Sequence, residues 1–302
     1  MEDFKRELIQ QLNAKIGYEG EVLESTVWKN NDIKKQGIAI RMCNKNVSKQ
    51  YYLDFLADMM KAGKSFEEVI DFIISDSKQD TVDIENIVEE LMDNNNIRER
   101  IIVKMTSTLF NHEYLKDKVY MTIEGTEFVA VFHILVGKMP KNVATAAISK
   151  NMWERLDLYS PEIEYENALR NTMREFPPVL KDLFGVIKDS KMFEDEIILE
   201  SLYESDIQIL ILGNEMSVNG STCILYPDVL KNIAKKFNTN LIILPSFCHE
   251  VLLVPLTGNE MNATHYREMV KSVNSTAVSD GEILSDNVYL YDLEIDKIRE
   301  WN

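Results

Sequence analysis

The chain has 302 residues, of which 45% are hydrophobic and 27% are charged, and its formal net charge is −17. These values are ordinary for a soluble globular protein and exclude a wholly disordered chain, and the length allows one or two domains. No apolar run approaches the roughly 18 residues that a membrane helix needs. The first residues lack the basic and apolar regions of a signal peptide, so we expect a cytoplasmic protein.

Acidic residues outnumber basic residues by 50 to 33, and residues 65–96 hold ten acidic residues and one basic residue. Direct binding of nucleic acid is not expected, because phosphate groups need basic partners. The ordinary explanation for the acidic segment is a set of solvated helix faces. The alternative is a binding face for a basic protein partner. The residues assigned to this candidate face are Glu67, Glu68, Glu85, Glu89, Glu90 and Asp93.

The N-terminal part of the chain predicts helices and one β-hairpin. Apolar residues recur with helical spacing over residues 4–16, and Gly17 ends this helix. Two strand-like runs flank the polar residues 30–32, which favour a hairpin turn. Ser65 and Glu68 form a capping box at the start of a helix. Further helices are predicted over residues 48–60, with Ser48 as the N-cap, and over residues 84–92.

The middle of the chain changes from strands back to helices. Residues 101–110 and 119–125 predict strands, whereas residues 127–137 fit either a buried strand or a buried helix, and His133 within them is expected to be a buried, hydrogen-bonded residue. Residues 149–187 return to a helical pattern. Ser149 and Ser160-Pro161 start two helices, and Pro177-Pro178 interrupts the second before helical structure continues.

The C-terminal third has the clearest pattern. Strands are predicted over residues 207–214, 221–226, 241–246, 250–255 and 287–293, and helices over residues 227–237 and 259–273. Asn219-Gly220 is typical of a hairpin turn. The short connections favour an α+β fold with a largely antiparallel sheet. We therefore expect a helix-rich N-terminal two-thirds with a hairpin, a C-terminal antiparallel sheet with packed helices, and a division into residues 1–190 and 191–302.

The turn between the predicted strands 241–246 and 250–255 holds four reactive side chains within five residues, namely Ser246, Cys248, His249 and Glu250. A hydrolase or transferase needs a nucleophile in contact with a base, and Ser246 or Cys248 with His249 could supply both. Asp228 is a further candidate partner for His249. The alternative is a scaffolding turn, because strand alternation sends neighbouring side chains to opposite faces. Both interpretations stay open at this stage.

A metal site or a cofactor is not expected. The three cysteines, Cys43, Cys223 and Cys248, are widely spaced and give neither a disulfide framework nor a zinc-binding pair. The four histidines are not paired at helical spacing, and no glycine-rich phosphate-binding motif occurs. Cys223 and Cys248 flank apolar strands and are expected to be small core residues.

The C-terminal pattern NGSTCILYPDVLKNIAKKFNTNLIILPSFCHEVLLVP, followed by ILSDNVYLYD at residues 283–292, resembles one uncharacterised bacterial family, DUF5688. The resemblance is most specific at Asn219-Gly220, Tyr226-Pro227-Asp228, Leu244-Pro245-Ser246, His249-Glu250 and Leu284-Ser285-Asp286. It implies a bacterial, cytoplasmic protein of the kind found in Clostridia. It brings no established activity, so no residue roles follow from it.

The sequence leads to three hypotheses about function. The first is a protein that acts by binding a protein partner through its acidic face. An inhibitor carried on a mobile element, or an acidic mimic of nucleic acid, would be a specific form of it. The second is a hydrolase or transferase that uses the 246–250 turn. The third is a structural, oligomer-forming protein, and the oligomeric state is not predicted.

Overall fold

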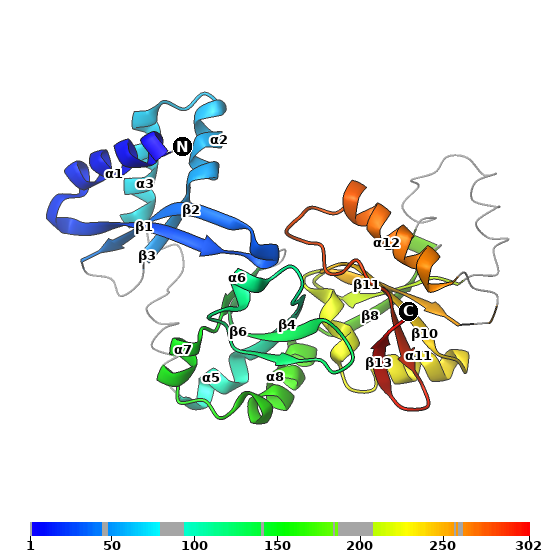
Figure 1. The fold of residues 1–302 in the computed structure, drawn as a ribbon. Helices are drawn as coiled ribbons and strands as arrows, with labels where there is room; N and C mark the ends of the chain where they lie inside the picture. Colours follow the sequence, from blue (N-terminus) through cyan, green and yellow to red (C-terminus); the bar gives the residue numbers. More distant parts are fainter. Residues whose placement is uncertain are drawn as a thin grey trace. The chain divides into compact units, whose positions relative to one another are not determined.

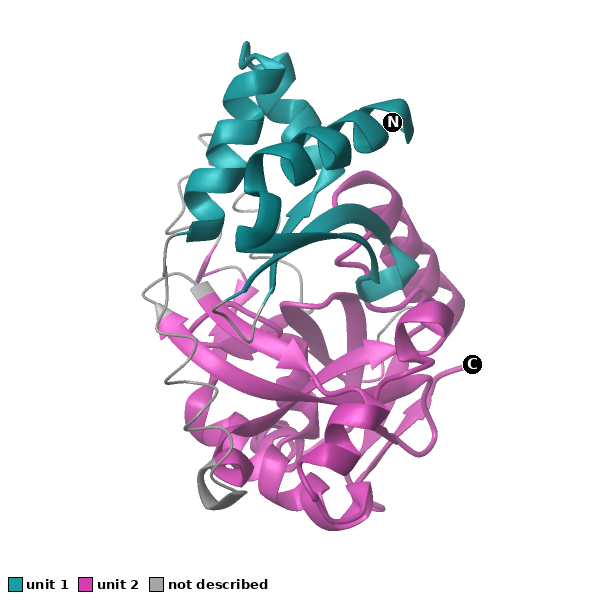
Figure 2. Ribbon diagram, turned by 90° about the vertical axis from the view of Figure 1, so that its left-hand side faces the viewer, with its two compact units in different colours: residues 1–93 teal, residues 94–302 magenta. Residues whose placement is uncertain are grey.

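The computed structural model describes residues 2–43, 48–78, 94–139, 142–183, 185–186, 208–256, 258 and 262–302. The chain forms two compact units, residues 1–93 and residues 94–302 (Figure 2). Both contain helices and antiparallel strands, so the protein is α+β (Figure 1). The helix predicted over residues 84–92 and four residues of the candidate acidic face lie outside the described residues. These four are Glu85, Glu89, Glu90 and Asp93.

Unit 1, residues 1–93, contains a three-stranded antiparallel sheet in the order β1-β2-β3. The predicted hairpin is confirmed, and its turn, η2, contains Asn31 and Asp32 with positive φ values of 59° and 50°. Asparagine and aspartate tolerate this left-handed conformation better than other residues. The elements are α1 (Glu2–Ile16), η1 (Gly17–Glu19), β1 (Gly20–Trp28), η2 (Asn30–Asp32), β2 (Lys34–Met42), β3 (Ser48–Tyr52), α2 (Leu53–Lys61) and α3 (Phe66–Lys78).

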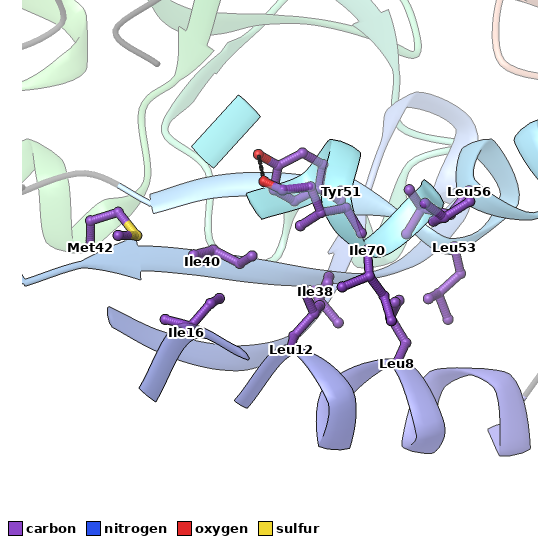
Figure 3. Packing of buried hydrophobic residues seen from close by; sticks show 12 residues of the cluster. Leu8, Leu12, Ile16, Ile38, Ile40, Met42, Tyr51, Leu53, Leu56 and Ile70 are labelled. Atoms are coloured by element: carbon purple, nitrogen blue, oxygen red, sulfur yellow. Dashed lines mark hydrogen bonds between the residues drawn. The ribbon is translucent and has the colours of Figure 1, made fainter. Parts of the chain in front are cut away.

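The core of unit 1 lies between its sheet and its helices (Figure 3). Leu8 and Leu12 are one turn apart on α1, and both are fully buried. Ile38 and Ile40 are two residues apart on β2, so both point to the same side of the sheet and join the same cluster. The helical spacing of apolar residues that predicted α1 therefore corresponds to a buried face of this helix.

The strand β3 corrects one prediction, because Ser48 does not cap a helix. Residues 48–52 pair with β2, with Tyr51 opposite Ile38, and the following helix begins only at Leu53. This pairing buries Tyr51, whose hydroxyl donates to Asp76 Oδ2 at 2.8 Å. The segment has apolar spacing that fits a helix, but its partner strand decides the structure.

Unit 2, residues 94–302, contains two antiparallel sheets. In the smaller one β4, β6 and β5 are neighbours and β7 pairs with β6, and the six-stranded sheet has the order β13-β12-β10-β11-β9-β8. Residues 127–137 are thus mainly strand β6. The elements are α5 (Asn94–Arg100), β4 (Ile101–Ser107), α6 (His112–Leu115), β5 (Tyr120–Thr122), β6 (Phe128–Met139), β7 (Asn142–Ala147), α7 (Lys150–Arg155), α8 (Pro161–Glu175), β8 (Pro178–Asp182), β9 (Leu210–Asn214), η3 (Gly220–Leu225), α11 (Val229–Phe237), β10 (Leu241–Phe247), β11 (Glu250–Pro255), α12 (Ala263–Thr276), β12 (Tyr289–Asp292) and β13 (Lys297–Glu300).

Two further segments differ from their predictions. Residues 178–182 form strand β8 where helix was expected, because they pair with β9 from Pro178 opposite Asn214 to Asp182 opposite Leu210. This pairing crosses residue 190, so the expected division there does not coincide with the two units. Residues 1–190 contain the three-stranded sheet of unit 1 and the smaller sheet of unit 2, so this part of the chain is less helical than expected. Asn219-Gly220 starts the 3-10 helix η3 instead of a hairpin.

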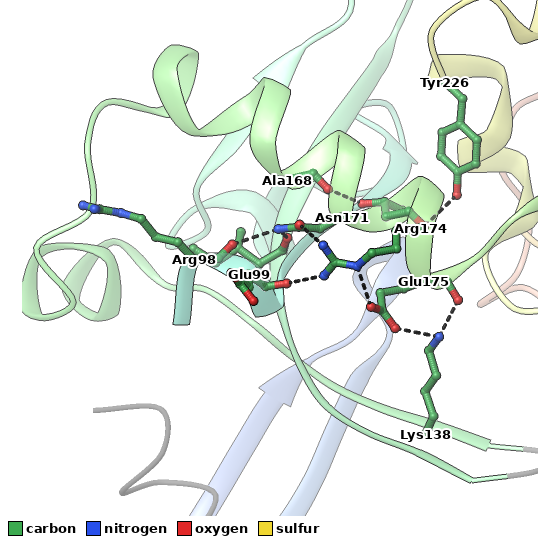
Figure 4. A network of polar contacts seen from close by, with 10 residues as sticks. Arg98, Glu99, Lys138, Ala168, Asn171, Arg174, Glu175 and Tyr226 are labelled. Carbon is green, nitrogen blue, oxygen red and sulfur yellow. Dashed lines mark hydrogen bonds and ion pairs between the residues drawn. The ribbon is translucent and has the colours of Figure 1, made fainter. Parts of the chain in front are cut away.

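One edge of β4 has no partner strand among the described residues, and side chains from α8 and η3 cover it instead. Thr172 on α8 accepts a hydrogen bond from Val103 N at 2.9 Å, and Thr222 on η3 accepts one from Met105 N at 3.0 Å. Asn171 donates to Ile101 O at 2.9 Å as part of a polar network around the end of α8 (Figure 4). A buried strand edge needs such partners, because its unpaired backbone groups are otherwise costly.

Candidate functional site

The candidate turn connects β10 and β11 in the six-stranded sheet. Regular pairing runs from Leu241–Pro255 to Leu244–Leu252, and the register then shifts before Phe247 faces Glu250. The backbone of the turn is held by an outside segment, because Leu284 N donates to Ser246 O at 3.0 Å. Ser246 is half-buried and Glu250 is exposed.

Cys248 lies inside the protein, where its surroundings disfavour the thiolate form. Its side chain is buried, and its carbonyl accepts hydrogen bonds from Ser221 N at 3.3 Å and from Ser221 Oγ at 2.7 Å. Burial raises the pKa of the Cys248 thiol to about 12. A nucleophilic cysteine needs a lowered pKa, because the thiolate is the reacting species.

His249 holds η3 against the hairpin. Its Nδ1 accepts a hydrogen bond from Asn219 N at 2.9 Å, and its Nε2 lies 3.4 Å from Glu282 Oε1. Since Nδ1 is the acceptor, the proton of the neutral ring is assigned to Nε2, facing this carboxylate. No hydroxyl or thiol in the described part of the chain hydrogen-bonds to the ring. The ring also packs edge-on against Phe247 at a centroid distance of 4.8 Å.

Gly220 allows this close contact between η3 and the turn. A Cβ atom at Gly220 would lie 2.3 Å from His249 O and 2.9 Å from Asn214 N, closer than any real side chain could be. Asn219 precedes it with a φ of 49°, in the left-handed region. These two residues shape a buried junction, which explains why a strong hairpin signal in the sequence produced a different structure.

Asp228 does not hydrogen-bond to His249. It follows η3 and lines a groove elsewhere in unit 2, with Lys231 and Tyr291 among its neighbours. Asp286, which belongs to the Leu284-Ser285-Asp286 pattern, accepts a hydrogen bond from Asn274 Nδ2 at 2.7 Å. The structure therefore separates Asp228 from the four residues of the turn.

Lys104 is a half-buried residue of unit 2 that no sequence motif pointed to. It lies on β4, where its Nζ donates to Thr145 Oγ1 at 2.7 Å, and it lines a small cavity beside Asn219 and Thr222. It forms no ion pair with any residue that the structure describes. Burial lowers the pKa of Lys104 to about 8. One lysine in the otherwise apolar run IIVKM was the available signal.

His133 is buried on β6 as expected, but its hydrogen bonding is incomplete. Its Nε2 lies 3.5 Å from the Tyr114 hydroxyl, and its Nδ1 has no hydrogen-bond partner among the described residues. Burial is the main reason why the pKa of His133 lies well below its usual value. His133 is therefore neutral at physiological pH.

The described part of the candidate acidic face lies on α3 in unit 1. Glu67 and Glu68 occupy its first turn, and the capping box is confirmed by hydrogen bonds from Glu68 N to Ser65 Oγ at 3.2 Å and from Ser65 N to Glu68 Oε2 at 2.8 Å. Lys15 Nζ lies 3.6 Å from Glu67 Oε1, and Lys64 Nζ lies 3.3 Å from Glu68 Oε1. Both carboxylates stay more than half exposed.

Two aromatic rings are exposed close to this acidic turn. Phe55 on α2 is 51% exposed, Phe72 on α3 is 36% exposed, and their ring centroids are 6.2 Å apart. Glu68 precedes Phe72 by one helical turn and thus shares its side of α3. We call Phe55, Phe72, Glu67 and Glu68 the α2–α3 surface.

The structure is that of an α+β protein in which the residues of the 246–250 turn contact η3 and the segment at residues 282–284. The profile of a family of unknown function, DUF5688, matches residues 1–293, and the chain belongs to this family. Comparisons with curated proteins and with solved structures gave no match. Within the described ranges, no helix has the length and apolar character to cross a membrane.

Proposed function

We propose that the protein acts by binding a protein partner with basic groups, and that the α2–α3 surface is its binding site. The observation that carries this proposal is the exposed pair Phe55 and Phe72 beside the acidic first turn of α3. Aromatic residues often supply the central contacts of protein interfaces, and surrounding charges select the partner. A basic partner fits both the local carboxylates and the net charge of −17.

The contacts at the turn favour binding over covalent chemistry. Cys248 has a raised thiol pKa, and the Nδ1 of His249 is occupied by a backbone N–H group. A base that activates a nucleophile must be within hydrogen-bond reach of it. These contacts support a scaffolding role for the turn, which connects η3 to the six-stranded sheet.

The acidity also fits the specific form of this proposal, in which the surface competes with nucleic acid for a basic protein. Carboxylates that lie beside apolar rings can pair with the basic groups of such a protein in place of phosphate groups. The four acidic residues outside the described ranges extend the candidate face in sequence. Reversing Glu85, Glu89 and Glu90 to lysine tests their part in binding.

The test is a capture experiment with the full chain, in which retained proteins are identified by mass spectrometry. A Phe55→Gln/Phe72→Gln variant should lose one specific partner that the wild-type chain retains. A Glu67→Lys/Glu68→Lys variant should slow association with that partner, most strongly at low salt. Tyr18→Gln is the matched control, because Tyr18 is a fully exposed aromatic residue of the same unit. Equal capture by the phenylalanine variant and the wild type would refute the proposal.

A further inference from the structure

Unit 2 contains an open groove that none of the expected functions uses. It has a volume of about 290 Å³ and is lined by residues of α8, α11 and the segments around η3, β5 and the β12–β13 turn. This volume is close to the lower end of the range for small-molecule sites, about 300 Å³, so the groove has room for a ligand of only a few heavy atoms. Its lining combines apolar side chains such as Ile224 and Leu225 with charged ones.

The charges in the groove do not cancel. Lys231 Nζ pairs with Asp296 Oδ2 at 2.6 Å, and Lys297 Nζ pairs with Glu124 Oε2 at 2.8 Å. Asp228 is a third carboxylate in the lining, and it forms no ion pair with any described residue. The groove therefore keeps one excess negative charge, which favours a cation and disfavours an anion.

The side chain of Asp228 has no hydrogen bond or ion pair with the described residues, although its charge contributes to the raised pKa of the neighbouring Lys231. Asp228 occupies the N-cap position of α11, yet its side chain makes no capping hydrogen bond. Its backbone has a φ of 62°, a left-handed conformation that is uncommon for residues other than glycine. The exposed carboxylate thus remains at the groove without a structural task in the helix.

Tyr165 on α8 adds a second unoccupied polar group. Its side chain is half-buried in the groove wall, and its hydroxyl makes no hydrogen bond with the residues that the structure describes. Burial raises the pKa of Tyr165 to about 12, so the hydroxyl stays protonated at neutral pH. A neutral phenol can accept a hydrogen bond from an ammonium group, and its ring attracts a cation.

We propose that this groove binds a small aliphatic ammonium ion, of the size of a four-carbon diamine. The carboxylate of Asp228 pairs with an ammonium group, the Tyr165 hydroxyl accepts a hydrogen bond from the ligand, and the alkyl chain contacts Ile224 and Leu225. The acidic field of the whole chain raises the local concentration of such cations. This site lies outside the α2–α3 surface and does not depend on the proposed protein partner.

Isothermal titration calorimetry of the full chain with 1,4-diaminobutane tests the proposal. The wild-type protein should bind one equivalent, and Asp228→Asn should weaken binding at least about tenfold, which corresponds to about 1.4 kcal/mol. Asparagine adopts the left-handed conformation readily, so this variant should fold normally. Tyr165→Phe keeps the ring and should weaken binding by a smaller factor.

Two controls separate recognition from general attraction. Glu268→Gln removes an exposed carboxylate on α12, away from the residues that line the groove, and should leave the affinity unchanged. The neutral analogue 1,4-butanediol should give no binding. The proposal is wrong if the diamine shows no saturable binding, if Asp228→Asn binds as tightly as the wild type, or if Glu268→Gln weakens binding equally. Binding of butanediol with the same affinity would also overturn it.

Discussion

Replacing Lys104 with methionine should stabilise unit 2 at neutral pH. The lysine lies on β4, where its Nζ donates a hydrogen bond to Thr145, and burial lowers its pKa from 10.5 to about 8. Methionine has a similar length and no charge, so it can fill the same space without the cost of burying an ammonium group.

The magnitude follows from the shifted pKa. A shift from 10.5 to about 8 makes the charged form of Lys104 less favourable in the folded state by about 3 kcal/mol. Loss of the hydrogen bond to Thr145 offsets about 1 kcal/mol of the gain. The expected net increase in the free energy of unfolding is therefore about 2 kcal/mol at pH 7.

The pH dependence has a definite sign. Because the folded-state pKa lies below the unfolded-state value, the penalty is complete below pH 8 and disappears as the pH rises towards 10.5. The stabilisation by Lys104→Met should therefore be largest at neutral pH and should fall to zero or below near pH 10.5. Comparing the two proteins at each pH cancels the titration of other groups.

Urea unfolding followed by tryptophan fluorescence measures this effect. A Trp28→Phe background leaves Trp153 and Trp301, so that the signal reports on unit 2. Lys271→Met is the matched control, because Lys271 is exposed on α12 and its replacement should change stability by less than about 0.5 kcal/mol. A loss of stability in Lys104→Met at pH 7, or a gain that stays constant between pH 8 and pH 10.5, would refute the reasoning.

Two substitutions at the junction around η3 test its packing by the same urea unfolding. Gly220→Ala should destabilise unit 2 by about 3 kcal/mol, because its Cβ would lie 2.3 Å from His249 O, whereas Gly137→Ala meets no atom within 4 Å and should be nearly neutral. Similar stabilities for these two variants would contradict the packing. Thr222→Val should cost about 1–3 kcal/mol, because it leaves the buried Met105 N without an acceptor, and Thr222→Ser should restore most of the loss. If serine and valine are equivalent at this position, the edge of β4 does not depend on the hydroxyl.

The candidate site shows why proximity in sequence was an incomplete guide. Four reactive residues within one turn were visible in the sequence, but their contacts were not. Only the fold shows that the backbone N–H of Asn219 occupies His249 Nδ1 and that Cys248 is buried. The groove at Asp228 is likewise assembled from segments that are more than 100 residues apart, such as those of Tyr165 and Ile298.

The sequence by itself determined the features whose physical cause is local. Helical spacing on α1, the capping box of α3 and the polar turn between β1 and β2 each depend on residues a few positions apart. Tertiary structure decided the segments whose partners are distant. Residues 48–52 and 178–182 became strands because β2 and β9 supply their hydrogen bonds, and the start of the 3-10 helix requires a glycine because the carbonyl of His249 lies against it. Backbone groups must find partners wherever the fold provides them, and a short sequence window does not contain those partners.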